Sequence, residues 1–220
     1  MIDDEGSARP NAIGRRGVLK IFGSVPLAAG VAITEAQAQT ARQGVQREAK
    51  AAAAKGKAFA PQFFNAHEWA TVRVLVDIII PKDERSGSAT DAGVPEFMDY
   101  MLRDPLATQR ELEERQTAMR GGLAWLDLEC QDRFDKTFLD CAEADRKAVL
   151  DDIAWPEKAK KRPELSQGVA FFTNLRDFTA SGFWSSKMGV EDLQYMGNTF
   201  VAEWKGCPPE VLKKLGIDNV

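Results

Sequence analysis

Apolar side chains recur at intervals of three and four residues through most of this chain, and prolines and glycines interrupt the pattern. The clearest segment carries Trp69, Val72, Val76 and Ile79 and stops at Pro81. This spacing puts one apolar face on a helix, which proline cannot continue. No segment alternates apolar and polar residues as a half-buried strand does. The sequence predicts an all-α fold, a single small domain of about six helices with long irregular loops.

Two adjacent glycines interrupt the longest expected helix. Gly121 and Gly122 lie in the middle of its apolar stripe. Glycine in a helix interior costs about 1 kcal/mol relative to alanine. We therefore expect either a kink at this point or the close approach of another backbone.

Composition divides the chain into three parts. Residues 61–220, roughly 160 in number, are enough for one domain with its own core. Residues 39–60 are rich in Ala, Lys and Gln and favour helix, but they show no apolar stripe to bury. We interpret this segment as a tether between the domain and residues 1–38.

Residues 1–38 have the order of an export signal. Arg15 and Arg16 are adjacent, Leu19 and Lys20 follow, and residues 21–33 form a short, weakly apolar run. This order predicts a twin-arginine signal, the twin-arginine translocase as a partner and a periplasmic location. A transmembrane anchor is the alternative, but spanning a bilayer takes roughly 20 apolar residues.

An A-x-A motif follows the apolar run. Ala36 and Ala38 fit a signal cleavage site, with the cut before Gln39. Whether the signal is removed is left open. Proteins that use the twin-arginine route are already folded, so such a chain either holds a cofactor or is bound to a partner that holds one.

The sequence lacks the usual constellations of catalytic residues. His67 is the single histidine and gives neither a triad nor a metal-ligand cluster, so it is interpreted as a helix-terminal polar residue. Asp83, Glu84 and Asp91 miss the spacing of a calcium loop. Neither phosphate-binding glycine motifs nor Cys-x-x-Cys pairs occur. We expect no catalytic, cofactor or metal site in this chain, and the formal net charge of −4 disfavours nucleic acid as a partner.

Three cysteines leave at least one thiol without a partner in the same chain. They are Cys130, Cys141 and Cys207. Cys130 and Cys141 would lie about 16 Å apart on one straight helix, so they can bridge only if the chain turns between them. Two readings stay open, namely buried free thiols and a disulfide from one of the three to another chain.

The chain is rich in aromatic residues, with five tryptophans and twelve phenylalanines. A group of large side chains falls in a segment that we expect to be irregular, and its members are Phe183, Trp184, Met188, Tyr195 and Trp204. Exposed aromatic residues and methionine are typical of a protein–protein interface. A small satellite core is the alternative.

Several blocks of the sequence form a pattern that is specific to one protein family. The blocks are Phe63–Trp69, Val76–Pro81, Asp83–Pro95, Phe171–Phe172 and Gly182–Trp184, with Gly197 beyond them. Together they resemble the gluconate 2-dehydrogenase subunit 3 family, the small or gamma subunits of bacterial flavin-dependent sugar dehydrogenases. The similarity covers roughly residues 63 to 204.

The resemblance implies a division of labour between subunits. In the family, a large subunit of the glucose-methanol-choline (GMC) oxidoreductase fold carries FAD and the catalytic residues, and a cytochrome c often receives the electrons. The small subunit resembles the one that carries the twin-arginine signal and escorts the large subunit through the membrane, so it supplies no catalytic residues.

We therefore expect a non-catalytic small subunit that stabilises the FAD-dependent partner and directs its export to the periplasm, with attachment to the inner membrane through the complex as one option. Two alternatives remain. The chain either contributes residues to the substrate pocket or electron path of the complex, or is a standalone periplasmic adaptor.

Overall fold

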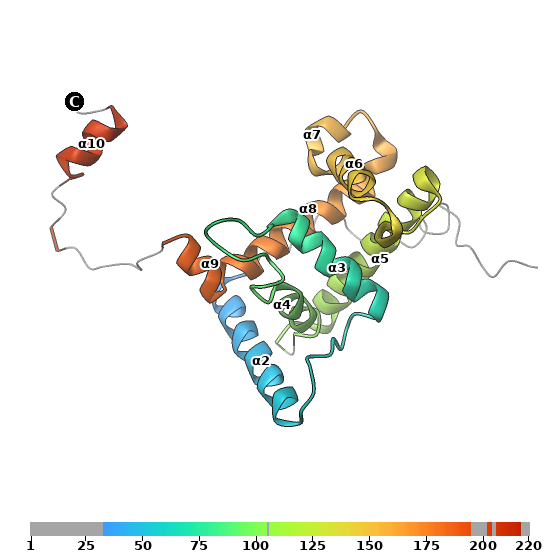
Figure 1. Ribbon diagram of the computed structural model, residues 1–220, viewed down its shortest axis with the longest axis horizontal. Coiled ribbons are helices and arrows are strands. Elements are labelled where there is room, and N and C mark those ends of the chain that lie inside the picture. The colour runs from blue at the N-terminus through green and yellow to red at the C-terminus, as the bar shows by residue number, and fades with distance from the viewer. Residues whose placement is uncertain (1–32, 105, 195–201, 204–205, 217–220) are drawn as a thin grey trace, which may run out of the picture.

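A computed structural model describes residues 33–104, 106–194, 202–203 and 206–216 (Figure 1). Within these residues the regular secondary structure is helical throughout, which confirms the all-α prediction. The elements are α2 (Glu35–Ala54), α3 (Ala66–Ile79), α4 (Val94–Met101), α5 (Gln109–Phe134), the 3₁₀ turn η1 (Phe138–Asp140), α6 (Glu143–Ala154), α7 (Pro156–Ala159), the 3₁₀ turn η2 (Pro163–Leu165), α8 (Ser166–Trp184), α9 (Lys187–Asp192) and α10 (Pro209–Leu215).

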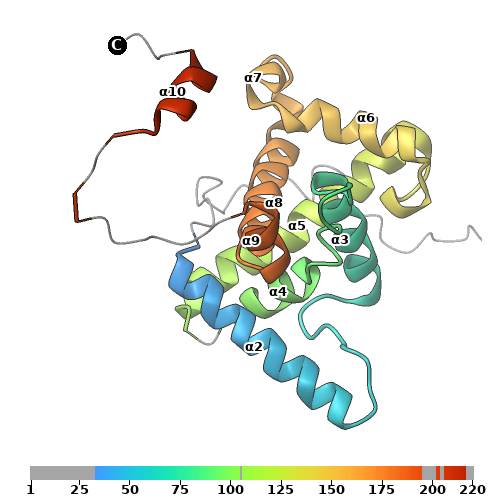
Figure 2. The same cartoon turned by 60° about the vertical axis from the view of Figure 1, so that its left-hand side comes forward.

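Helix α8 is the central element of the fold. It contacts α3, α4, α5, α6, α7 and α9, and Figure 2 shows it running through the middle of the helical body. Phe171, Leu175 and Phe178 follow the i, i+4, i+7 spacing and are buried against these neighbours. The core therefore surrounds α8.

Helices α5 and α8 approach closely at two glycines. A side chain on Gly122 of α5 would overlap the ring of Phe171, and one on Gly168 of α8 would overlap the indole of Trp125. Each glycine thus makes room for an aromatic ring from the other helix. The expected close approach at Gly122 is a side-chain contact rather than a backbone one, and α5 continues as one helix through the glycines.

Helix α2 corrects the expectation that residues 39–60 have nothing to bury. Thr34 caps this helix, which then lies along α4 (Figure 2). Ala38, Ala41 and Gly44 are buried, and Gly44 faces the ring of Tyr100. The buried face consists of alanine and glycine, so a search for large apolar residues misses it.

A buried carboxylate holds the segment that joins α2 to α3. Asp99 of α4 accepts hydrogen bonds from the backbone N–H groups of Gln62, Phe63 and Phe64, at 2.9 to 3.2 Å. It also pairs with Arg103, which lies just beyond the end of α4. A single side chain thereby fixes the entry into α3.

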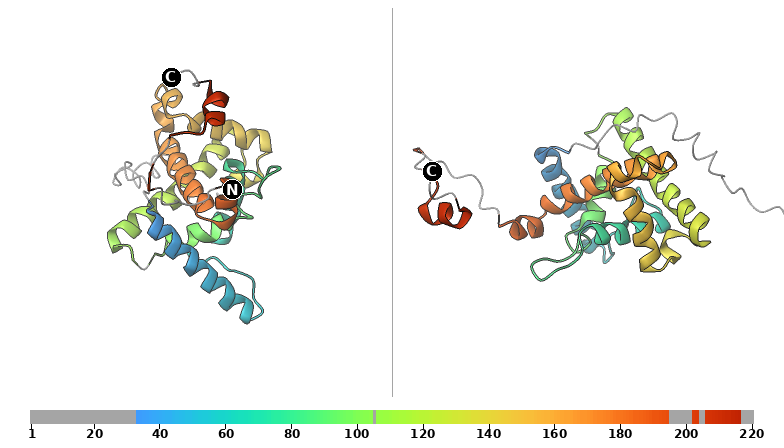
Figure 3. Two further views of the ribbon diagram at one scale, coloured as in Figure 1. Left: turned by 90° about the vertical axis from the view of Figure 1, so that its left-hand side faces the viewer. Right: turned by 90° about the horizontal axis from the view of Figure 1, so that it is seen from above.

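The C-terminal part differs from expectation. The aromatic-rich segment that we expected to be irregular is largely helical up to Asp192, because α8 continues to Trp184 and α9 follows after a short break. The last helix is α10. Figures 1 and 3 show α10 apart from the other helices, and none of its residues is buried.

Candidate functional site

Exposed apolar side chains gather where α8 gives way to α9. Trp184 ends α8, Val190 lies in α9 and Leu193 follows α9, and these residues are 39%, 37% and 56% exposed. We call these three residues the α9 patch. Figure 1 shows α9 at the edge of the helical body, next to the start of α2.

Local capping positions the α9 patch. The Ser186 hydroxyl accepts the N–H of Gly189 at 3.0 Å, so the chain restarts as a helix immediately after α8. Gly189 lies against the backbone of Phe183, where a side chain would collide with the carbonyl group. This close contact folds α9 back on the end of α8.

The structure separates the large side chains that we expected at an interface. Phe183 is buried, and its ring contacts that of Trp184 edge-on with 4.9 Å between centroids. Met188 is half-buried and packs against the core. Tyr195 and Trp204 lie outside the described residues. Among the five, Trp184 is the one that the structure places in the α9 patch, and the assignment of Phe183 to an interface is wrong because it belongs to the core.

Charged groups border the α9 patch. The Arg85 guanidinium, in the loop between α3 and α4, lies 3.3 Å from the Asp192 carboxylate and also donates to the Asp192 carbonyl. Lys187 and Glu191 form an ion pair one turn apart on α9 at 3.7 Å. An apolar centre with a charged rim is the usual anatomy of a protein–protein interface.

A partly buried arginine ties α2 to the end of α8, next to the α9 patch. Arg42 of α2 donates to the carbonyl oxygens of Ala92 and Gly93 at 3.0 and 3.2 Å, and to that of Gly182 near the end of α8. Its guanidinium lies 4.9 Å from the centroid of Phe97. Burial lowers the pKa of Arg42 to about 10, so it remains charged at neutral pH. Arg42 thus fastens α2 to the helix end that carries the patch.

The family model for gluconate 2-dehydrogenase subunit 3 matches residues 66–203, more than half of the chain. The chain belongs to this family. The match runs from the start of α3 past the end of α9 and therefore includes the α9 patch. No curated protein and no solved structure matches the chain.

The histidine of this subunit 3 family member joins two helices. His67 Nε2 lies 2.6 Å from the Asp127 carboxylate, so this polar residue connects the first turn of α3 to α5. The same carboxylate accepts the N–H of Phe138 at 3.0 Å. Both contacts join segments of this chain to each other, so the role of His67 and Asp127 is structural. The sequence did not reveal this role because the partners are far apart in the chain.

The acidic loop after α3 is an ordinary turn. Asp83 accepts the N–H groups of Arg85 and Ser86, both at 2.8 Å, and these hydrogen bonds lower the pKa of its carboxyl group. No group of three or more His, Cys, Asp or Glu residues among the described parts of the chain could hold a metal ion.

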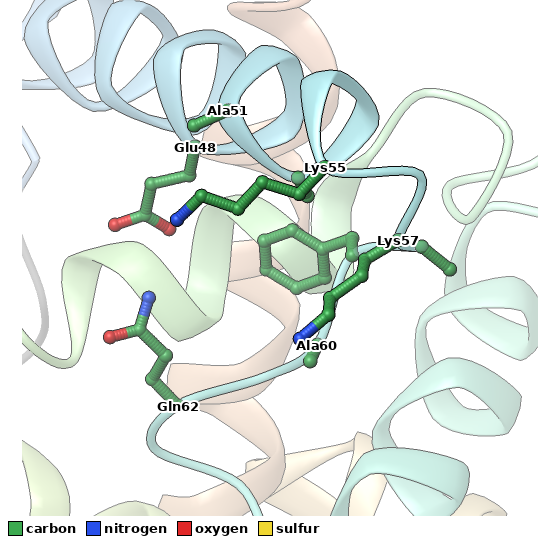
Figure 4. Close-up of a pocket in the computed structure, with 9 residues that line it drawn as sticks. Glu48, Ala51, Lys55, Lys57, Ala60 and Gln62 are labelled. Atoms are coloured by element: carbon green, nitrogen blue, oxygen red, sulfur yellow. The ribbon is translucent and has the colours of Figure 1, made fainter.

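A hollow of about 370 Å³ lies beneath the end of α2 (Figure 4). Glu48 of α2 and Lys55, the residue that caps the end of α2, reach toward it, while Lys57 and Gln62 border it from the following segment. Alanine side chains supply much of the remaining lining. Such a lining offers flexible charges and methyl groups rather than the convergent polar groups of a cofactor site.

The three cysteines have different surroundings. Cys130 and Cys141 are buried, whereas Cys207 is exposed. Burial keeps Cys130 and Cys141 out of reach of another chain, so the inter-chain reading applies to Cys207.

The proposed signal falls partly outside the described residues. Arg15, Arg16, Leu19 and Lys20 are not described, whereas Ala36 and Ala38 lie in α2, with Ala38 buried. The expected cut before Gln39 would thus fall inside a packed helix. In the part of the chain that the structure describes, no helix combines the length and apolar character needed to cross a bilayer.

Proposed function

We propose that this chain is the non-catalytic small subunit of a periplasmic FAD-dependent sugar or glycoside dehydrogenase. It binds and stabilises a flavin-carrying large subunit of GMC type and is exported with it. The observation that carries the proposal is the α9 patch, an apolar centre with a charged rim inside the region that matches the subunit 3 family.

The exposure of helix α10 is a second observation in favour of a large binding partner. It has seven residues, none of them buried, and its apolar Val211 and Leu215 are exposed. Isolated helices shorter than about 12 residues are marginal in water. Docking on a large subunit would bury these side chains and stabilise the helix.

The proposal assigns the chemistry to the partner. Following the family resemblance, the large subunit holds FAD and oxidises the sugar, and a cytochrome c accepts the electrons. Arg15 and Arg16 address the assembled, folded complex to the twin-arginine translocase, and the complex brings the chain to the periplasmic face of the inner membrane.

Coexpression with a GMC-type large subunit from the same genome tests the proposal. The chain should copurify with a yellow partner that shows the visible absorbance of a bound flavin. Removing the chain should leave the large subunit in the cytoplasm with a lower FAD content. A large subunit that is exported and loaded with FAD equally well without this chain would overturn the proposal.

The export step has a matched control. Changing Arg15 and Arg16 together to lysine should hold both subunits in the cytoplasm, because the signal loses its guanidinium pair. Arg9→Lys makes the same chemical change outside the motif and should leave export unchanged. Equal export of both variants would contradict the twin-arginine assignment.

A second candidate follows from the exposure of Trp184. An indole at the edge of the patch would reach the partner's substrate pocket or electron path if the patch covers that region. Trp184→Ala would then lower kcat while the purified complex stays intact. Purification of the wild-type chain as a stable monomer, with no dehydrogenase bound, would instead indicate a standalone adaptor.

A further inference from the structure

Cys130 and Cys141 meet where the chain turns back after α5. Cys130 lies in the last turns of this helix, and beyond its end Asp135 adopts a left-handed conformation with φ of 57°. The short η1 then returns the chain to the side of α5, and Cys141 directly follows η1. The turn that a bridge between these cysteines requires is therefore present.

Hydrogen bonds fix this return of the chain. Asp127, about one turn before Cys130, accepts the N–H of Phe138 at 3.0 Å. The Cys141 N–H donates to the Thr137 carbonyl at 3.1 Å, which places Cys141 one turn beyond the anchored start of η1. The return of the chain thus brings Cys141 alongside Cys130, and their side chains are close enough to hydrogen-bond.

Both cysteines belong to the core, with exposed fractions of 0% and 3%. Burial, helped by the adjacent Cys141, raises the pKa of Cys130 to about 12, so its thiol is protonated and unreactive while the fold is closed. A structural zinc ion would need four ligands. No cluster of even three occurs in the described residues, so a zinc site does not account for the pair.

We propose that Cys130 and Cys141 become an intrachain disulfide after the folded chain is exported. The inference rests on the proposed export, since disulfides persist in the periplasm and are reduced in the cytoplasm. The bond joins the end of α5 to the turn that leads into α6. The disulfide would add a covalent link between two segments that the Asp127–Phe138 hydrogen bond already joins.

The oxidant is a disulfide of a periplasmic thiol–disulfide oxidoreductase. One cysteine attacks this disulfide as its thiolate, a mixed disulfide forms, and one oxidoreductase thiolate leaves. The second cysteine then attacks the mixed disulfide, so that the Cys130–Cys141 bond forms and the oxidoreductase departs as a dithiol. Two electrons and two protons pass from this chain to the oxidoreductase.

Burial makes local opening a necessary step. The segment between α5 and α6 is short, and its regular structure is the three-residue η1. We therefore expect this segment to unfold locally before the helices around α8 do. Oxidation of the pair should therefore be slower than labelling of Cys207, which is exposed.

Thiol labelling of the full chain, purified from the periplasm after acid quenching, tests the inference. Under denaturing conditions without reductant, we expect a maleimide to label neither Cys130 nor Cys141, whether or not Cys207 is labelled, and a Cys130–Cys141 cross-linked peptide to appear on digestion. The intact mass should lie about 2 Da below that of the reduced chain, since two hydrogen atoms are lost. The variant with Arg15 and Arg16 changed to lysine, held in the cytoplasm, should show three labelled cysteines.

Two cysteine variants separate the outcomes. Cys207→Ser should keep the cross-link, and Cys141→Ser should lose it and expose Cys130 to labelling in the denatured chain. Three labelled cysteines in wild-type chain that has reached the periplasm would overturn the disulfide. If the chain is not exported, oxidising the purified chain with glutathione disulfide still tests the pairing. A Cys130–Cys141 bond would support it and leave only export refuted, and its absence would overturn both.

Discussion

Asp99 shows how much one buried carboxylate can organise. Three consecutive backbone N–H groups and the Arg103 guanidinium surround it, and its side chain is fully buried. An asparagine in its place would turn an NH₂ group toward these donors. We expect Asp99→Asn to lower the free energy of unfolding by about 3 kcal/mol, because it leaves buried donors without an acceptor.

Urea denaturation of purified protein measures this loss. Asp151→Asn makes the same change on an exposed face of α6 and should stay within about 0.5 kcal/mol of wild type. Equal stabilities of the two variants would show that Asp99 is replaceable. The sequence gives no sign of this role, since the three N–H donors lie 35 to 37 residues before Asp99 in the chain.

Glu96 gives the fold a pH dependence. Burial raises the pKa of its carboxyl group, an effect to which Asp99 adds and which Arg73 and Arg42 oppose. The folded state therefore holds its proton more tightly than the unfolded state, and its contribution to stability is lost as pH rises through the folded pKa, above 4.5. Glu96→Gln should gain stability relative to wild type as pH rises through the folded pKa of Glu96.

Thermal unfolding at several pH values tests this gain. Glu113→Gln changes an exposed carboxylate on α5 and serves as the control, with a difference from wild type that should vary little with pH. A Glu96→Gln difference that is the same at every pH would contradict the proposed effect of burial.

At the scale of elements, periodicity predicts helices with large apolar residues and misses those that pack through small ones. The stripe on α3 is visible from its spacing alone. Helix α2 instead buries Ala38, Ala41 and Gly44, and its strongest anchor is Arg42, a residue that usually indicates surface. The sequence also could not show that Gly122 faces Phe171, since this contact depends on how α5 crosses α8.

The packing of α2 leads to a prediction about processing. A cut before Gln39 would remove the capping Thr34 and the buried Ala38, so the folded chain should resist it. Proteases prefer exposed, irregular segments, which α2 does not provide at this bond. We expect N-terminal sequencing of the exported chain to find no molecules that begin at Gln39.

A destabilised helix start supplies the matched test. Ala38→Pro places proline after the first turn of α2 and removes a helix hydrogen bond, that from the residue 38 N–H to the Thr34 carbonyl. If packing protects this bond, limited proteolysis should cut the variant near residue 38 sooner than wild type. A mature wild-type chain that starts at Gln39 would contradict the prediction.

For the whole molecule, the fold class follows from the sequence but the division between core and surface does not. Phe183 and Trp184 are adjacent aromatic residues, and nothing in their spacing says that the first is buried and the second exposed. That difference arises because α8 continues beyond Gly182 and α9 folds back on it. The patch therefore emerges from tertiary packing, and it lies in the segment where the sequence led us to expect an interface.

The α9 patch should determine assembly without determining the fold. Leu193→Asp places a charge in an apolar centre at a side chain that is 56% exposed, so the isolated chain should keep its Tm while the complex with the large subunit weakens at least tenfold, a loss of about 1.4 kcal/mol or more. Leu106→Asp makes the same change in the loop between α4 and α5, at a leucine that is 73% exposed, and should bind as wild type does. Copurification yield and a titration of the two subunits measure the difference. Equal weakening by both variants would indicate a general effect of the added charge and would contradict a specific role of the α9 patch. Unchanged binding of Leu193→Asp would show that the interface lies elsewhere. Helix α10 would then be the next surface to test, because its apolar side chains are also exposed.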